Sequence, residues 1–217
     1  MERKTTLQTK ETRLHHSVAV IGGFMGIYAV LLRGALGSSA TSNLLLITSA
    51  FLQWDLKAFL LYGGALLCLV AGISLASMGK HLCKRFDFRW AVLAVQVVGC
   101  VGLALIPADA PALPALYPLF FTTAMQWVAF SSAAGFQSST VFSTNNLRQA
   151  VSGVVEYACT RDHAHMERAR FFGGSLLSFF LGSLLGFGAI RLAGAYGILF
   201  CLLPVAVSAL LLRDLKK

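Results

Sequence analysis

The segment "FSTNNLRQ", Phe142–Gln149, is a short polar interruption in a chain that is otherwise rich in long apolar runs. A similar interruption, "SSATSNLLLI", occupies Ser38–Ile47. Each is followed by an apolar segment, Leu44–Trp54 in one case and Leu147–Ala158 in the other, of about 11 or 12 residues. That length is too short to cross a bilayer and predicts a re-entrant or interfacial helix.

Both polar interruptions contain residues that favour the first position of a helix. Thr41 or Ser42 can cap the first short helix, and Ser143, Thr144 or Asn145 can cap the second.

The composition places the chain in a lipid bilayer. Hydrophobic residues make up 57% of the sequence and charged residues only 12%, whereas soluble domains carry about 25% charged residues. The net charge is +9, but the basic residues cluster between apolar runs. They therefore indicate membrane topology, and we expect no nucleic-acid partner.

Enzyme and metal signatures are weak or missing in the sequence. No P-loop, HExxH motif or nucleophile elbow is present. The run "RDHAHMER", Arg161–Arg168, spreads its histidines around a helix and is a poor metal site. We therefore expect no catalytic residues, no cofactor and no bound metal.

Six segments are apolar and long enough to be candidate membrane spans. They are Ser17–Ala35, Ala58–Ser77, Trp90–Ile106, Ala115–Phe136, Phe171–Ile190 and Leu192–Leu212. Residues 1–16 are then a cytoplasmic tail and residues 214–217 a cytoplasmic end. This arrangement leaves only Arg33, Lys57 and Arg191, of the 18 basic residues, outside. The positive-inside rule therefore predicts that both termini are cytoplasmic.

The two polar interruptions align when the sequence is shifted by 103 residues. Thr41 falls on Thr144, Asn43 on Asn146 and Leu44 on Leu147. Each half then reads as a span, a polar break, a short helix and two more spans. We expect an all-α membrane protein with six transmembrane helices. It would form two inverted-topology three-helix repeats, residues 17–106 with a break at 38–43 and residues 107–213 with a break at 137–146.

The stretches "GGFMGIYAVLLRGALGSSATSNLLLI" (residues 22–47) and "GFQSSTVFSTNNLRQA" (135–150) resemble the two signature regions of the YoaK family, uncharacterised bacterial membrane proteins with a domain of unknown function. Thr41-Ser42-Asn43 and Thr144-Asn145-Asn146 take the places of the family's T-G-N motifs. The chain departs from the family at the central glycine of each motif and lacks the acidic residue expected after Gly23-Phe24. The resemblance implies a multi-pass protein of the bacterial inner membrane that transports a small molecule.

A ligand site is expected where the two short helices begin. Helix N-termini present N–H groups and a partial positive charge, and the neighbouring hydroxyls and amides add donors and acceptors. The candidate substrate-binding residues are Thr41, Ser42, Asn43, Ser143, Thr144, Asn145, Asn146 and Arg148. Glu156 is a candidate coupling residue, or else a solvated acid at the interface.

Two functional hypotheses follow. The first is a secondary transporter or permease for a small polar or anionic solute bound at the paired helix breaks, or an anion channel of similar build. The second is a non-transporting assembly or sensory protein in which the breaks only pack helices. Besides the lipid bilayer, a partner could be a second copy of the chain. The stripe of Gly174, Ser178, Gly182 and Gly186 is typical of close helix packing, within the fold or in a homodimer.

Overall fold

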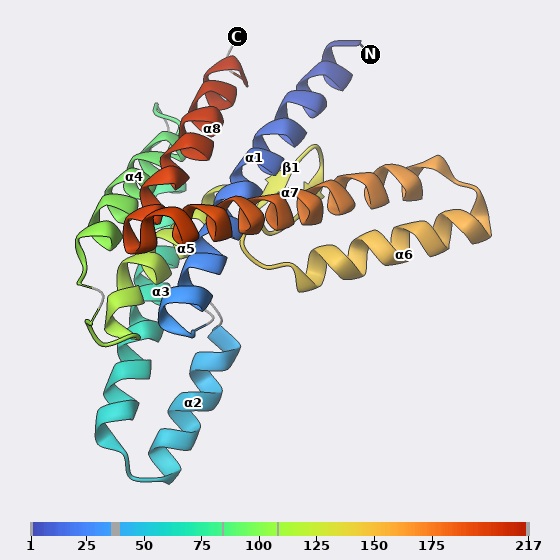
Figure 1. Cartoon of the computed structure of the whole chain (residues 1–217). Helices are drawn as coiled ribbons and strands as arrows, with labels where there is room; N and C mark the ends of the chain where they lie inside the picture. Colours follow the sequence, from blue (N-terminus) through green and yellow to red (C-terminus); the bar gives the residue numbers. More distant parts are fainter. Residues whose placement is uncertain (1, 36–39, 84, 108, 216–217) are drawn as a thin grey trace.

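The fold consists almost entirely of helices. A computed structural model describes residues 2–35, 40–83, 85–107 and 109–215, with side chains from Leu7 onward. In order, the elements are α1 Glu2–Arg33, α2 Ala40–Leu52, α3 Leu56–Leu82, α4 Arg89–Leu105, the 3₁₀ turn η1 Pro114–Leu116, α5 Tyr117–Ala129, β1 Ser132–Ala133, β2 Phe136–Gln137, α6 Thr144–Thr160, α7 His163–Ala193, the 3₁₀ segment η2 Gly194–Cys201, and α8 Leu202–Leu215 (Figure 1).

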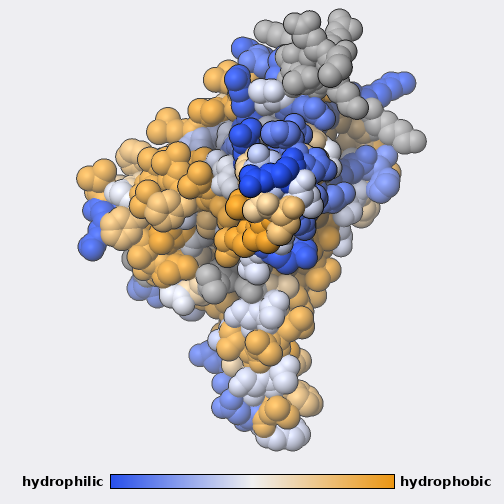
Figure 2. Space-filling view, turned by 90° about the vertical axis from the view of Figure 1, so that its right-hand side faces the viewer, coloured by the Kyte–Doolittle hydropathy of each residue, from blue (hydrophilic) through white to orange (hydrophobic). Residues whose placement is uncertain are grey.

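Three helical stretches of the described chain are long and apolar enough to cross a membrane. They are Leu7–Arg33, Leu56–Leu82 and His163–Leu215. Many large apolar side chains on these helices are exposed, among them Leu67, which is 69% exposed, and Leu177, which is 70% exposed. Figure 2 shows hydrophobic residues over a broad part of one face. An apolar exterior of this extent is the surface of a multi-pass membrane protein.

Helices from the two halves of the chain pack in matching pairs. α1 runs along α7, and α3 runs along α5, while α2 packs on α3 and α6 packs on α7. In Figure 1 the pairs α2–α3 and α6–α7 form two hairpins that extend from the body in different directions. α4 and α8 pack against each other.

Glycine lets the backbones of α1 and α7 touch. A Cβ added at Gly182 would lie 2.0 Å from the Val20 carbonyl oxygen, and one added at Gly23 would lie 1.9 Å from the Phe179 carbonyl oxygen. The predicted small-residue face of α7 therefore packs inside the fold, against α1.

The contacts at the two ends of the body agree with the predicted division into inner and outer segments. Lys10 Nζ donates to the Asp214 carbonyl oxygen at 2.9 Å, so the chain ends lie at one side, as Figure 1 shows. At the other side, Arg33 donates to the carbonyl oxygens of Ala110 and Pro107, both at 2.9 Å. Arg33 and that loop were both assigned to the outer side from charge alone.

Two segments differ from the expected spans near the N-terminus and in the middle of the chain. Residues 1–16 were predicted to be a tail, but α1 is continuous from Glu2 and runs into the first span. The predicted span Ala115–Phe136 is interrupted, because α5 ends at Ala129 after 13 residues and the β1–β2 hairpin follows. The hairpin turns through Ala134 (φ 52°) and Gly135 (φ 86°), a conformation that ends a helix.

The last two predicted spans are joined differently from expectation. The predicted boundary at Arg191 lies inside α7, which continues to Ala193, and η2 then leads into α8. Gly194, with φ 58°, ends α7 in a conformation that favours glycine. The described residues therefore do not show the six predicted spans.

Candidate functional site

The two short helices form where the polar motifs predict them. α2 has 13 residues and α6 has 17, and α6 begins directly at Thr144 with Ser143 in the N-cap position. The Ser143 side chain makes no capping hydrogen bond. In the first motif Ser38 and Ser39, and with them part of the predicted break at 38–43, lie outside the described residues.

One asparagine from each motif is buried, and its neighbours are not. Asn43 is 4% exposed and Asn146 is 3% exposed. The remaining candidates are more open: Ser42 and Ser143 are half-buried, and Thr41, Thr144, Asn145 and Arg148 are exposed. The sequence treated each motif as one polar cluster, whereas the structure turns a single amide of each inward.

The burial pattern of the two helices repeats with the spacing found in the sequence. α2 buries Asn43 and Ala50, and α6 buries Asn146 and Gly153. Both pairs are separated by seven residues, two helical turns along one face, and the second pair lies 103 positions after the first. The same face of each short helix is therefore turned toward the protein.

Asn146 belongs to a closed set of hydrogen bonds. Its Nδ2 donates to the Ser139 carbonyl oxygen at 2.7 Å, and its Oδ1 accepts from Ser138 Oγ at 3.0 Å. Ser138 Oγ also lies 2.9 Å from His15 Nε2. His15 falls in residues 1–16, which the sequence predicted to be a tail, but it is only 2% exposed.

The side-chain amide of Asn43, unlike that of Asn146, has an unpaired nitrogen in the described chain. Its Nδ2 is buried and has no hydrogen-bond partner among the residues that the structure describes. Leaving a buried donor unpaired costs about 1–3 kcal/mol. A buried amide of this kind is therefore available to a ligand or a water molecule.

Two glutamines that the motif search missed continue the polar interior. Gln126 Nε2 donates to the Val18 carbonyl oxygen and to Thr140 Oγ1, both at 3.1 Å, and Gln96 Nε2 donates to Gln126 Oε1 at 2.8 Å. Both glutamines are 0% exposed. Both glutamines lie in the middle of predicted spans. This position could have identified them from the sequence, because polar side chains inside a membrane protein form hydrogen bonds between helices.

Arg148 and Glu156 do not join this interior. Arg148 Nη2 donates to Asn145 Oδ1 at 3.0 Å on the exposed side of α6. Glu156 Oε2 lies 2.9 Å from His165 Nδ1 and 3.0 Å from Arg168 Nη1. Glu156 therefore ties α6 to α7 while its side chain stays 42% exposed.

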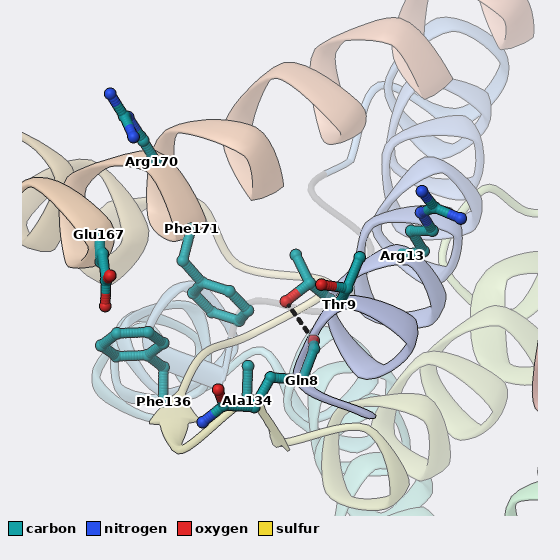
Figure 3. A pocket seen from close by; sticks show the side chains of 9 residues that line it. Gln8, Thr9, Arg13, Ala134, Phe136, Glu167, Arg170 and Phe171 are labelled. Atoms are coloured by element: carbon teal, nitrogen blue, oxygen red, sulfur yellow. Dashed lines mark hydrogen bonds between the residues drawn. The ribbon is translucent and has the colours of Figure 1, made fainter. Parts of the chain in front are cut away.

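A cavity of about 580 Å³ opens between α1, the β1–β2 hairpin and α7, and none of its lining residues is a predicted site residue. Figure 3 shows Phe136 and Phe171 close together in it, with Arg170 directed away; their ring centroids are 4.9 Å apart. Its other lining residues are Gln8, Thr9, Thr12, Arg13, Ala134 and Glu167. Within residues 2–35, 40–83, 85–107 and 109–215, no group of three or more His, Cys, Asp or Glu could hold a metal ion.

Comparison with known proteins identifies a family. The model of the family described as "Protein of unknown function (DUF1275)" matches residues 14–211, nearly the whole chain. No curated protein and no solved structure matches the chain. DUF1275 corresponds to the YoaK-like uncharacterised membrane proteins, whose two signature regions contain the buried Asn43 and Asn146. The chain therefore belongs to the DUF1275 family of membrane proteins of unknown function.

Proposed function

We propose that this protein is a permease for a small polar or anionic solute, and that Asn43 and Asn146 contact the solute. The burial of these two asparagines carries the proposal. They are the equivalent residues of two short helices in a largely apolar chain, and each is turned inward while its polar neighbours face out. Polar groups at membrane depth are costly and commonly mark a solute path.

The paired packing supports an inverted repeat. If the helices α1–α4 are matched in order with α5–α8, then α1 corresponds to α5 and α3 corresponds to α7. The α1–α7 contact then corresponds to the α5–α3 contact, and the α2–α3 hairpin corresponds to the α6–α7 hairpin. The equivalent burial of Asn43 and Ala50 with Asn146 and Gly153 follows the same exchange. In transporters built this way, the solute binds near the midplane at interrupted helices.

The proposed location is the bacterial inner membrane, with both termini in the cytoplasm. Lys10 and Asp214 lie at the same side of the body, and basic residues predicted to be cytoplasmic gather there. This arrangement supports the proposed orientation of the termini. Lys80 Nζ donates to the carbonyl oxygen of Val128 and Arg89 is paired with Asp87 near the same end.

One observation favours the non-transporting alternative for the second motif. Both polar atoms of the Asn146 amide are satisfied within the chain, by Ser138 and Ser139. This bonding holds the 138–140 segment on α6 and uses one of the two Nδ2 hydrogens of Asn146. The unpartnered Nδ2 of Asn43 favours transport instead.

Solute uptake by liposomes separates the two functions. Purified protein in liposomes is given radiolabelled chloride, phosphate, glycine or urea in turn, with empty liposomes as the control. A permease takes up at least one of these solutes faster than empty liposomes, and the rate saturates with concentration. Uptake equal to that of empty liposomes across this range of anions and neutral solutes would favour the assembly or sensory role.

A further inference from the structure

A small cavity lies beside His15. Its volume is about 30 Å³, and it is lined by Glu11 and His15 of α1, Arg89 of α4, and the segment around Phe130 and Ser132 that follows α5. A polar cavity of this size can hold about one water molecule. It lies next to the β1–β2 hairpin, and Glu11 Oε2 accepts from the Ala134 backbone N–H at 2.8 Å.

The hydrogen bonds around His15 determine which ring nitrogen carries the proton. Asn146 Nδ2 donates to a carbonyl oxygen, so its Oδ1 must be the atom that faces Ser138. The single hydroxyl hydrogen of Ser138 is then used on Asn146 Oδ1, and Ser138 Oγ can only accept from His15 Nε2–H at 2.9 Å. In the neutral ring, the lone pair is therefore on Nδ1.

This lone pair is buried without a partner. Nδ1 makes no hydrogen bond to any residue that the structure describes, although His15 is only 2% exposed. Nothing in the Ser138–Asn146 bonding uses Nδ1, so a proton can be added there without breaking a hydrogen bond. Protonation would leave Nε2–H in place and make both nitrogens donors.

The surrounding charges act in both directions on a proton at Nδ1. Glu11 lies four residues before His15, on the same face of α1, and its carboxylate favours the charged ring. His16, whose ring centroid is 6.4 Å away, and Arg89 oppose it, but Arg89 is paired with Asp87 at 2.8 Å. Burial favours the neutral ring until water enters the cavity.

We propose that His15 Nδ1 is a proton-binding site that couples the permease to protons, with access through the cavity lined by Glu11 and Arg89. This rests on the permease function proposed above. A hydronium ion or water in the cavity gives a proton to Nδ1, forming an N–H bond and leaving water or hydroxide, and the reverse step releases it. The charged ring donates more strongly to Ser138, which passes the change to Asn146.

Nitrogen-15 NMR of histidine-labelled protein in lipid tests proton binding without any transport. The His15 signals are assigned by their loss in His15→Gln. Near neutral pH we expect the tautomer with the proton on Nε2, and protonation of Nδ1 on acidification. A neutral ring with its proton on Nδ1, or an Nδ1 that stays unprotonated at every pH at which the protein remains folded, would overturn the proposal.

Uptake driven by a pH gradient tests the coupling. His15→Gln places an amide N–H where Nε2–H was, so the donor to Ser138 remains while the proton site is lost. The readout is the ratio of uptake rates with and without an imposed gradient, for whichever of chloride, phosphate, glycine and urea the wild type carries. We expect a ratio above one for the wild type, equal rates for His15→Gln, and the wild-type ratio for His81→Gln, an exposed histidine at the end of α3.

Glu11→Gln gives a second variant if His15→Gln does not fold. It keeps an acceptor for the Ala134 N–H and removes the negative charge, so we expect Nδ1 to protonate only at lower pH than in the wild type. The coupling would be overturned if the pH gradient did not change uptake by the wild type. It would also be overturned if the gradient still increased uptake by the His15→Gln variant. If the wild type carries no solute, the permease function fails instead, and the NMR titration alone decides whether His15 binds a proton.

Discussion

At the scale of single residues, the hydrogen bonds of Gln126 connect three parts of the chain. Its amide nitrogen reaches Val18 in α1 and Thr140 in the segment before α6, and its oxygen accepts from Gln96 in α4. These bonds lie in a fully buried environment. Removing one partner of such a set leaves the other groups buried and unpaired.

Gln126→Leu should therefore be among the more destabilising substitutions of the interior. We expect a loss of about 1–3 kcal/mol, the cost of leaving buried polar groups unpaired. Thermal unfolding of the purified protein in detergent measures it. Gln96→Leu is the matched comparison, because Gln96 Oε1 already lacks a partner in the described chain. A larger loss for Gln96→Leu than for Gln126→Leu would contradict this ranking.

Sequence reasoning identified Asn43 and Asn146 among its candidates but could not separate them from Thr41, Thr144 and Asn145. Local motifs show which residues are polar; helix packing decides which of them turns inward. His15 was missed because it lies in the polar segment predicted to be a tail and its partner Ser138 is 123 residues away. Such a contact exists only after α1 is packed against the second half of the chain.

At the scale of elements, the crossing of α1 and α7 depends on glycine. Gly182 and Gly188 lie on the same helix but on different faces. A methyl group at Gly182 would meet the Val20 carbonyl oxygen at 2.0 Å, whereas one at Gly188 meets no atom of the described chain within 4 Å.

We expect Gly182→Ala to force α1 and α7 apart and to lower the thermal stability of the purified protein clearly. Gly188→Ala should leave it unchanged or raise it, because alanine favours a helix over glycine by about 1 kcal/mol. Thermal unfolding of the detergent-solubilised variants measures the difference in stability. Equal stabilities of the two variants would show that the backbones do not approach closely at Gly182.

The two short helices were predictable because a polar motif followed by a brief apolar run is a local signal. The length of α5 was not. Hydropathy extends through residues 115–136, but the helix stops at Ala129, where Ser131 Oγ donates to the Val128 carbonyl oxygen and the chain enters the β1–β2 hairpin. Hydroxyl groups that bond to the nearby backbone compete with helix formation. The mean hydropathy of a segment does not detect this effect.

At the scale of the whole molecule, charge predicts the orientation in the membrane. The contacts of Arg33 with Pro107 and Ala110 place the loop before α5 on the side opposite the chain ends. A cysteine in that loop should therefore face the outside of the cell.

Labelling of intact cells with a membrane-impermeant maleimide measures this orientation. In a background with exposed Cys83 and Cys159 changed to serine, Asp109→Cys should react from outside. Asp162→Cys, in the turn between α6 and α7, should react only after the membrane is opened. The reverse pattern would place the termini outside and exclude the proposed topology.

The two predicted motifs match in their burial, whereas the six predicted spans are not shown among the described residues. Asn43 and Asn146 occupy equivalent buried positions, and so do Ala50 and Gly153. The count of six spans rested on hydropathy alone, whereas the described chain has three long apolar helical stretches, and α4 and α5 are shorter. The shared packing faces thus support the proposed repeat more clearly than the helix lengths do.

Solute uptake by variants of the two asparagines tests the central claim most directly. Asn43→Ala and Asn146→Ala are compared in liposomes with Asn145→Ala, whose exposed amide neighbours Asn146. The account predicts that both buried-site variants lose most of the wild-type uptake, on the order of tenfold for about 1.4 kcal/mol of lost solute interaction, while Asn145→Ala keeps it. Wild-type uptake in both Asn43→Ala and Asn146→Ala would contradict the account.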